Sequence, residues 1–464
     1  MAVSTLYPRP DVKELLEADR KHLIHPLLHP EDHQDPIIFV KGEGATLIDA
    51  SGTRYIDGLS CLWNVNIGHG RRELADAAYA QMTSLEYASC YTGSSNVPAI
   101  ELAAKIVEHA YPSSAAVFFT SGGAESNESA LKTARFYHKA RGNPNKTKFI
   151  ARTFGYHGIT FGAMSATGLA AYWKMFEPRM PGFFHAPAPY PYRYEGYPPF
   201  DQVGRLAAEA IEKLILEQGP ETVAAVIGEP IQGAGGVIVP PPDYWPRVRA
   251  ICDKYDVLLI ADEVITGFCR TGKWFAMGHW GVEPDIVSFA KGVTSGYFPL
   301  GGIIVSKRIH ETMLNVKWED RWMHAYTYSG HPTGCAVGLA NLKIMEAERL
   351  DERAAKLGTR LYEGLKSLSD LEWVGDVRGG YGLLAAVEIV KDKATRGDFP
   401  AAWKVGEHVK AQMKARGLVS RSVRDVICFA PPLTATEQEI DRIVEIMREA
   451  IPAGIEAAKA AASR

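Results

Sequence analysis

Two residues of this sequence, an aspartate and a lysine, each follow a short apolar run and carry side chains suited to catalysis. Residues 257–261 lead into Asp262, and residues 286–290 lead into Lys291. Apolar runs of this length are typical of strands buried on both faces of a parallel sheet, where ligands bind at the strand ends. There the amine can form a Schiff base with an aldehyde, while the carboxylate keeps a ring nitrogen protonated. Pyridoxal phosphate requires an amine and a carboxylate in these two roles. From these two residues alone, a structural ion pair is the alternative.

A glycine-rich turn at residues 120–127 separates a predicted strand at 117–120 from a helix that runs through 130–135. Gly122 and Gly123 allow the backbone to turn sharply. The free N–H groups and the positive dipole end of the helix would then face a phosphate. The turn is neither a GxGxxG motif nor a Walker A loop, so an ordinary tight turn is the alternative.

Three other polar segments are candidates for a binding site. Residues 154–158 follow a predicted strand and carry Tyr156, whose ring is suited to stacking on a cofactor. Residues 228–236 are glycine-rich and follow another strand, and Thr327 lies in a polar segment where its hydroxyl could meet a phosphate oxygen. Taken singly, these segments are equally compatible with simple packing and with turns.

The elements that would position these residues alternate between strands and helices from about residue 100 onward. This alternation predicts a mostly parallel central sheet with helices on both faces, an α/β fold. The further elements expected here are strands at 148–152 and 223–227, helices at 206–216 and 244–255, and an ordered surface loop in the Pro- and Tyr-rich segment 182–200.

Both ends of the chain are expected to form a second, smaller α+β unit. Residues 38–57 alternate apolar and polar side chains as an antiparallel hairpin does. The C-terminal part is expected to hold a long helical stretch at 335–367, a helix at 402–416, a short strand at 426–429 and a final helix at 436–450. We therefore expect an N-terminal arm and hairpin at 1–65 as part of the small domain, a large cofactor-binding domain at 66–330, and the C-terminal part of the small domain at 331–464.

The composition narrows the class of protein further. A chain of 464 residues is too long for one simple core, and 46% hydrophobic and 23% charged residues are ordinary for a globular protein. The net charge of −3 gives no basic surface for nucleic acid or an anionic membrane. No signal peptide is visible and no apolar run approaches the roughly 20 residues of a membrane span. A cytoplasmic protein without nucleic-acid or membrane partners is expected.

Metal binding is not expected either. The six cysteines lack CxxC spacing, so the sequence indicates neither a zinc site nor a disulfide framework. Residues 11–35 are polar and contain His22, His25, His29 and His33. Because no carboxylate or cysteine stands at a convincing ligand spacing, a solvated arm or an interface segment is favoured over a metal site there.

In their order along the chain and in their amino-acid sequences, these segments together resemble the class III aminotransferases, the ω-amino acid branch of the fold-type I pyridoxal phosphate enzymes. The resemblance runs from about residue 35 to the end of the chain. It implies a fold-type I transferase fold and a homodimer, or a tetramer, with active sites at the subunit interface. It also implies that Lys291 is the Schiff-base lysine and that Asp262 binds the pyridinium nitrogen of the cofactor.

The same resemblance implies the other cofactor contacts. Val264 and Tyr156 would cover the two faces of the ring, and Thr327 would reach the phosphate bound by the neighbouring subunit. The turn Gly122, Gly123 and Ala124 would cradle the phosphate of the chain's own cofactor. Many relatives have Ser or Thr followed by Glu-Ala in this turn, where this chain has Gly123-Ala124-Glu125. Backbone N–H groups must therefore replace a missing side-chain hydroxyl.

The substrate is expected to be chosen mainly at Ala234 and Arg421. The branches that resemble GABA and ornithine aminotransferases carry a gating Glu where this chain has Ala234. Arg421, ten residues before Pro431, would then be free to bind a carboxylate through two parallel hydrogen bonds. Arg424 is the rival carboxylate binder, and a surface ion pair is the structural alternative for Arg421.

The apolar part of the substrate is expected to meet aromatic side chains. Trp63 would provide a flat wall for the side chain of the amine, with a core or interface position as the alternative. Tyr91 would reach the pocket across the dimer interface.

From this resemblance we expect an amine:pyruvate transaminase, or ω-transaminase. It would move an amino group from a primary amine or ω-amino acid to pyruvate, giving alanine, through a ping-pong cycle of the cofactor's pyridoxal and pyridoxamine forms. A decarboxylase or aminomutase on the same scaffold is the alternative within the cofactor class. A nucleotide- or phosphosugar-binding α/β protein and a non-catalytic scaffold are the alternatives outside it.

Overall fold

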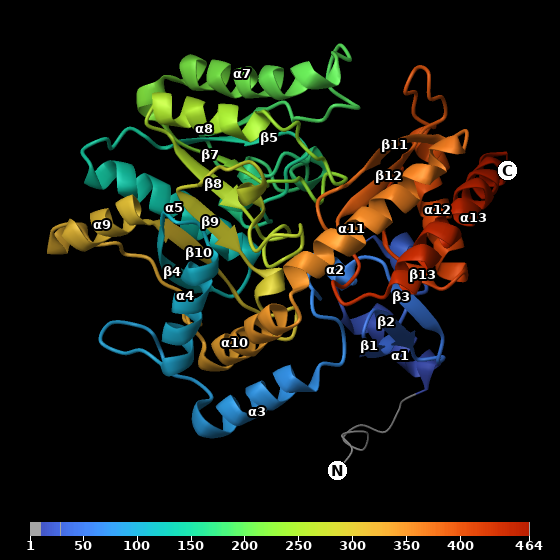
Figure 1. Cartoon of the computed structure of the whole chain (residues 1–464), viewed down its shortest axis with the longest axis horizontal. Helices are drawn as coiled ribbons and strands as arrows, with labels where there is room; N and C mark the ends of the chain where they lie inside the picture. Colours follow the sequence, from blue (N-terminus) through green and yellow to red (C-terminus); the bar gives the residue numbers. More distant parts are fainter. Residues whose placement is uncertain (1–10, 28, 464) are drawn as a thin grey trace.

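A seven-stranded sheet forms the centre of the larger part of the molecule (Figure 1). The structure is a computed structural model and describes residues 11–27 and 29–463. In spatial order the strands are β4 (Ser114–Thr120), β10 (Gly301–Ser306), β9 (Ile286–Phe289), β8 (Leu258–Asp262), β7 (Val223–Gly228), β5 (Lys148–Arg152) and β6 (Phe183–Ala186). β10 is antiparallel to both of its neighbours, whereas β9, β8, β7, β5 and β6 are parallel to one another. The mostly parallel central sheet predicted from the sequence is confirmed.

Helices cover both faces of this sheet, and the sequence of each strand shows why. Successive side chains of a strand point to opposite faces. In β8, Leu258 and Ile260 belong to one apolar cluster, together with residues of α5 (Gly123–Ala140). Leu259 and Ala261 belong to the other cluster, with residues of the remaining covering helices. Those helices are α4 (Val97–His109), α7 (Phe200–Gln218), α8 (Tyr244–Lys254) and α10 (Pro332–Ala347).

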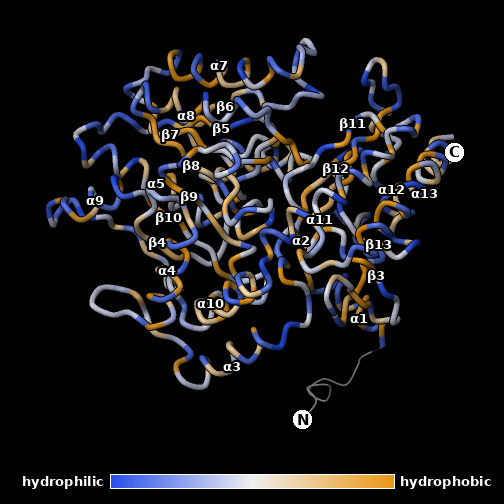
Figure 2. The backbone as a smooth tube through the Cα atoms, in the orientation of Figure 1, coloured by the Kyte–Doolittle hydropathy of each residue, from blue (hydrophilic) through white to orange (hydrophobic). Residues whose placement is uncertain are grey.

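The smaller part of the molecule is built from both ends of the chain, as expected. One sheet has the order β1 (Phe39–Glu43), β2 (Thr46–Asp49), β3 (Arg54–Asp57) and β13 (Leu418–Val419), and β13 runs parallel to β3. A second sheet has the order β11 (Val374–Arg378), β12 (Ala385–Ile389), β15 (Val426–Phe429) and β14 (Arg421–Val423). Helices α11 (Leu350–Lys366) and α12 (Val405–Ala415) pack against these strands, and α13 (Glu437–Ala462) packs against α12 and α11. Figure 2 shows hydrophobic residues running along β12 and α13.

The remaining α-helices are α1 (Val12–His22), α2 (Ser60–Trp63), α3 (Arg72–Leu85), α6 (Phe161–Ala166) and α9 (Lys307–Asn315), and several short 3-10 helices lie between the elements. None of the helices in the described part of the chain has the length and apolar character needed to cross a membrane.

Several predicted elements were wrong in detail. The segment 182–200 is not only a loop, because its residues Phe183–Ala186 form the edge strand β6. The helical stretch 335–367 is two helices, α10 and α11, separated at Arg349, whose φ of 49° ends the helical path. The final helix runs to Ala462 and passes through Pro452. The helix α1 within the segment 11–35 and the strand β10 were not predicted, and a solvated arm or an interface segment stays the prediction for 11–35. The domain limits at residues 65 and 330 stay predictions.

Candidate active site

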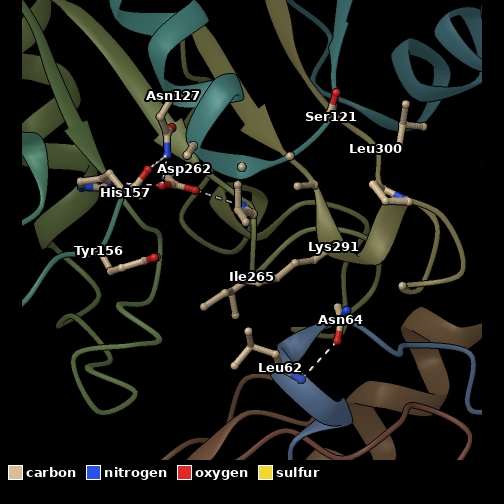
Figure 3. A pocket seen from close by; sticks show the side chains of 18 of the residues that line it. Leu62, Asn64, Ser121, Asn127, Tyr156, His157, Asp262, Ile265, Lys291 and Leu300 are labelled. Atoms are coloured by element: carbon tan, nitrogen blue, oxygen red, sulfur yellow. Dashed lines mark hydrogen bonds and ion pairs between the residues drawn. The ribbon is translucent and has the colours of Figure 1, made fainter. Parts of the chain in front are cut away.

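A cavity of about 390 Å³ lies at the ends of the parallel strands of the large sheet (Figure 3). Its wall contains both residues with which the sequence analysis began, Asp262 and Lys291. The other contributions come from the segments after β4, β5 and β7 and from the segment around α2. Of the predicted site residues, the wall contains Gly122, Gly123, Ala124, Tyr156, Asp262, Val264 and Lys291.

Asp262 is the last residue of β8 and is held by several donors. Its side chain is 3% exposed. Oδ2 accepts hydrogen bonds from Asn127 Nδ2 at 2.8 Å and from His157 Nδ1 at 2.7 Å, and Oδ1 accepts one from the backbone N–H of Val264 at 3.1 Å. Because the carboxylate has only acceptor atoms, the hydrogen in the His157 contact lies on Nδ1. The carboxylate is thereby fixed in one orientation at the cavity wall.

Lys291 follows β9 in a short 3-10 turn and has φ of 46°. Its amine makes no hydrogen bond or ion pair with any residue that the structure describes. Burial lowers the pKa of Lys291 to about 8, the charge of Arg421 acts in the same direction, and Asp262 and Glu229 oppose it. Near pH 8 about half of these amines are therefore neutral and able to act as nucleophiles.

The glycine-rich turn forms a concave backbone surface at the start of α5. Gly122 precedes the helix in an extended conformation without a side-chain cap, so the first N–H groups of α5 have no partner within the helix. A Cβ atom at Gly123 would lie 3.0 Å from Cγ1 of Val264. At Gly158, where φ is 126°, a Cβ would lie 2.7 Å from that of Ala124. The turn can lie this close to its neighbours only because these positions are glycines.

The polar residues of the wall that had no role assigned from the sequence include Asn127, His157 and Glu229. Each lies inside or beside a segment that the sequence analysis singled out. Glu229 accepts hydrogen bonds from the backbone N–H groups of Tyr156 and Gly233, both at 2.9 Å. Burial raises its pKa. The spacing of Asn127, four residues after Gly123 on α5, places both on one face of the helix and would have indicated its position.

Four predicted substrate or cofactor residues lie outside the wall of this cavity, namely Trp63, Tyr91, Thr327 and Arg421. Trp63 is 2% exposed and belongs to an apolar cluster with Ile265, while its neighbour Leu62 lines the cavity. Tyr91 is 60% exposed, and Thr327 is exposed. The structure of a single chain therefore places Tyr91 and Thr327 on the surface and Trp63 behind the wall.

The two candidate arginines occupy different places on the hairpin formed by β14 and β15. Arg421 begins β14, is half-buried and lies close enough to Lys291 for its charge to lower the pKa of the amine. Its guanidinium forms no hydrogen bond or ion pair with the described residues. Arg424 lies in the hairpin turn, 5.7 Å from the ring centroid of Phe154, and lines a separate cavity of about 360 Å³. Of the two, Arg421 is the one near the Asp262–Lys291 cavity.

Comparison with known proteins agrees with this geometry. The family model described as aminotransferase class-III matches residues 28–451. The chain belongs to the class III aminotransferases. It is 42% identical to diaminobutyrate–2-oxoglutarate transaminase of Halomonas elongata, over 95% of this chain and 96% of that protein. It is 41% identical to putrescine–pyruvate aminotransferase of Pseudomonas aeruginosa, over 89% of this chain and 90% of that protein.

A solved structure of another class III aminotransferase has the same fold. The (S)-enantioselective ω-transaminase of Thermomicrobium roseum superposes with a TM-score of 0.93 at 47% identity, covering 97% of this chain and all of that one. This similarity identifies the fold as that of fold-type I pyridoxal phosphate transferases, as the sequence analysis expected.

Class III aminotransferases depend on pyridoxal phosphate, and the cavity fits this cofactor. The uncapped N-terminus of α5 offers free N–H groups to a phosphate. Asp262 presents a fixed carboxylate to a ring nitrogen, and the unpartnered amine of Lys291 lies in the same cavity. The donor set is therefore the one that the cofactor needs.

Proposed function

We propose that this class III aminotransferase transfers an amino group from a primary amine or ω-amino acid to pyruvate, giving alanine. The observation that carries the proposal is Arg421, a half-buried cation near Lys291 that has no acidic partner among the described residues. A planar guanidinium binds a carboxylate through two parallel hydrogen bonds. Ala234, at the position where a Glu would gate this arginine, offers no competing carboxylate. Arg421 can therefore bind the carboxylate of a keto acid and turn aside for an amine that has none.

We assign the following roles to the residues of the cavity. Pyridoxal phosphate, when bound, supplies a ring that accepts electrons from the amine-bearing carbon of the substrate. Lys291 holds the cofactor covalently before the substrate arrives, and its Nζ then takes the proton from the donor carbon and delivers it one step later. Asp262 keeps the ring nitrogen protonated, and Asn127 and His157 hold that carboxylate in place.

The remaining contacts position the cofactor. The backbone of Gly122, Gly123 and Ala124 would bind the phosphate, since the helix they begin has uncapped N–H groups. Val264 and Tyr156, which both line the cavity, would flank the ring from opposite faces, as the resemblance to the family implies.

We further propose that the active site is completed by a second copy of the chain. Tyr91 and Thr327 lie on the surface of a single chain, although the resemblance to the family gives both a place at an active site. Exposed apolar side chains lie in the same segments, including Tyr87, Val97 and Tyr328. A homodimer that buries this surface would carry Thr327 to the partner's phosphate. We propose that Trp63 supports Leu62 and Ile265 from behind in the donor pocket. We also propose that the domain boundaries lie between residues 65 and 66 and between residues 330 and 331.

The amino acceptor is tested directly by the second half-reaction. The enzyme in its pyridoxamine form is mixed with pyruvate or with 2-oxoglutarate, and the amino acid formed in one turnover is measured. Alanine should form much faster than glutamate. Faster formation of glutamate would overturn the assignment of pyruvate.

The donor is tested by a panel of amines and ω-amino acids with pyruvate as acceptor. Each good donor should yield one ketone or aldehyde for each alanine. Release of CO2, or rearrangement of the donor without alanine, would instead indicate the decarboxylase or the aminomutase.

A further inference from the structure

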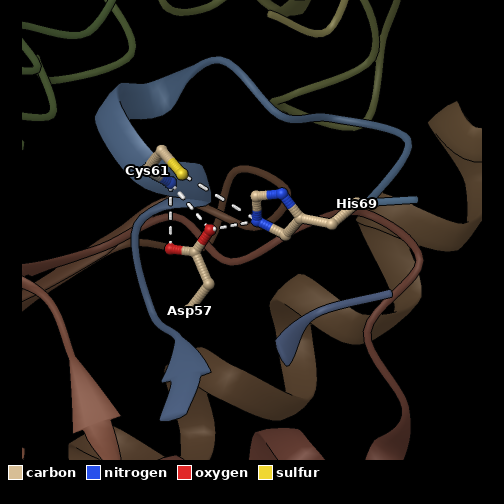
Figure 4. A group of neighbouring side chains, drawn as sticks. All are labelled: Asp57, Cys61 and His69. Carbon is tan, nitrogen blue, oxygen red and sulfur yellow. Dashed lines mark hydrogen bonds and ion pairs between the residues drawn. The ribbon is translucent and has the colours of Figure 1, made fainter. Parts of the chain in front are cut away.

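An aspartate, a cysteine and a histidine lie together (Figure 4), and none of the three lines the cavity. Asp57 ends β3, Cys61 lies in α2, and His69 follows shortly after. One ligand atom from each of these side chains lies within 4.8 Å of the other two. Among the side chains that the structure describes, no other group of three His, Cys, Asp or Glu residues is arranged in this way.

The distances are close to those of a metal's coordination shell. His69 Nε2 lies 2.8 Å from Asp57 Oδ2 and 3.9 Å from Cys61 Sγ. Ligand atoms around a tetrahedral Zn²⁺ are about 3.3–3.6 Å apart, given metal–ligand lengths of roughly 2.0–2.3 Å. Shifts of about half an ångström would therefore bring both of these distances into the tetrahedral range.

The backbone around the cluster is already fixed. Both oxygens of Asp57 accept hydrogen bonds from the N–H of Cys61, at 2.8 and 2.9 Å, and Oδ1 also accepts one from Leu59 N at 3.1 Å. His69 exchanges two backbone hydrogen bonds with Gly44, at 2.8 and 3.0 Å. The side chains of Asp57 and His69 are 1% and 13% exposed, whereas Cys61 is exposed. The side chains of the cluster are thus carried by a backbone that hydrogen bonds hold in place.

A dication would bind the sulfur of Cys61 as a thiolate, because a coordinated thiol is deprotonated. Sulfur and imidazole ligands favour Zn²⁺ and similar thiophilic ions over Mg²⁺ or Ca²⁺.

The cluster is joined to the active site by the chain itself. Ser60, Cys61 and Trp63 all have positive φ values, of 49°, 56° and 64°. Residues other than glycine adopt this conformation only when their surroundings hold them in it. The neighbouring residues Leu62 and Asn64 line the Asp262–Lys291 cavity. A metal at Cys61 would therefore hold the segment that presents these two residues to the substrate.

We propose that Asp57, Cys61 and His69 bind one Zn²⁺ or similar thiophilic dication per chain, and that the ion stabilises residues 60–64. Binding forms bonds from the metal to Asp57 Oδ2, Cys61 Sγ and His69 Nε2. The thiol proton leaves to the solvent, and the imidazole proton moves from Nε2 to Nδ1, so no oxidation or reduction takes place. Because a proton is released, the metal should bind more weakly as the pH falls.

The test is a Cd²⁺ titration of chelator-treated holoenzyme, followed by the ultraviolet charge-transfer band between cadmium and thiolate. The parent enzyme should develop this band with one Cd²⁺ per chain, and Zn²⁺ should compete it away. Cys61→Ser should abolish the band. His69→Gln should keep the thiol but weaken Cd²⁺ binding by more than the roughly 10–100-fold that loss of an outer partner costs.

Two matched controls separate this site from other metal-binding groups. Cys90 is the other exposed cysteine, and Cys90→Ser should leave the titration unchanged. The double variant His25→Gln/His33→Gln removes a stacked histidine pair in the N-terminal segment and should also leave it unchanged. The visible absorbance of the bound cofactor checks that each variant is folded. No band in the parent enzyme, a band that survives Cys61→Ser, or equal affinity in His69→Gln would overturn the proposal.

Discussion

Replacing Arg421 by alanine should impair the reaction with pyruvate far more than the reaction with a simple amine. Arg421 is half-buried, and its guanidinium forms no ion pair with the described residues. Truncating one partner of a desolvated, hydrogen-bonded charge pair costs about 2–5 kcal/mol. The value of kcat/KM for pyruvate should therefore fall by roughly 30-fold to several-thousand-fold. An amine donor without a carboxylate makes no such contact, so its half-reaction should change little.

The assay measures the two half-reactions separately by single-turnover absorbance of the cofactor. Arg424→Ala is the matched control, because Arg424 lies on the same hairpin but lines a different cavity. Its effect should stay within the roughly twofold range of an ordinary surface substitution. A second readout is independent of substrate. Because the charge of Arg421 lowers the pKa of Lys291, Arg421→Ala should move that pKa upward. Equal losses for pyruvate and amine, or a larger loss in Arg424→Ala, would refute the assignment.

Three other predictions concern the cofactor and the stability of the chain. The apoenzyme should take up pyridoxal phosphate faster as the pH rises through about 8, since the pKa of Lys291 is lowered to that value and only the neutral amine reacts; stopped-flow absorbance measures the rate. Gly158→Ala should weaken cofactor binding, measured by absorbance titration, because the added Cβ would lie 2.7 Å from that of Ala124. Arg378→Ala should destabilise the protein by about 3 kcal/mol in denaturant unfolding, because it leaves the buried Glu388 without its nearest cation.

Specific results would contradict each of these three predictions. Uptake of the cofactor that is independent of pH, or that slows as the pH rises from 7 to 9, would contradict the lowered pKa of Lys291. Cofactor affinity in Gly158→Ala equal to that of the parent would show that the turn can relax. The expected loss for Arg378→Ala is at the lower end of the roughly 3–5 kcal/mol range for a broken buried pair, because Arg193 still contacts Glu388 at 2.6 Å. Unchanged stability would contradict this reasoning.

Much of the large sheet could be predicted because its strands are short apolar runs between turns. β5 has the predicted limits, as does β15 in the smaller part of the molecule, and Asp262 ends β8 while Lys291 follows β9. The edge strand β6 was missed because its four residues lie beside a segment rich in proline. The break between α10 and α11 was missed because Arg349 adopts φ of 49° without any glycine or proline to indicate it.

It was harder to predict which side chains line the site than to predict the chemistry of the site. Sequence motifs indicated which segments approach the cavity, but not which side chain of a segment faces it. In residues 60–64 the positive φ values turn Leu62 toward the cavity and Trp63 into the apolar cluster behind it. The proximity of Asp57, Cys61 and His69 likewise depends on this irregular backbone, which no periodic pattern encodes.

The measurement that tests the central claim most directly is reduction of the purified enzyme with borohydride, followed by peptide mapping. The account predicts a yellow protein that loses its visible absorbance on reduction and carries one cofactor per chain, bound covalently to Lys291. Lys291→Ala should carry none. A colourless protein that cannot be reconstituted, or a cofactor fixed to any other lysine, would contradict the account.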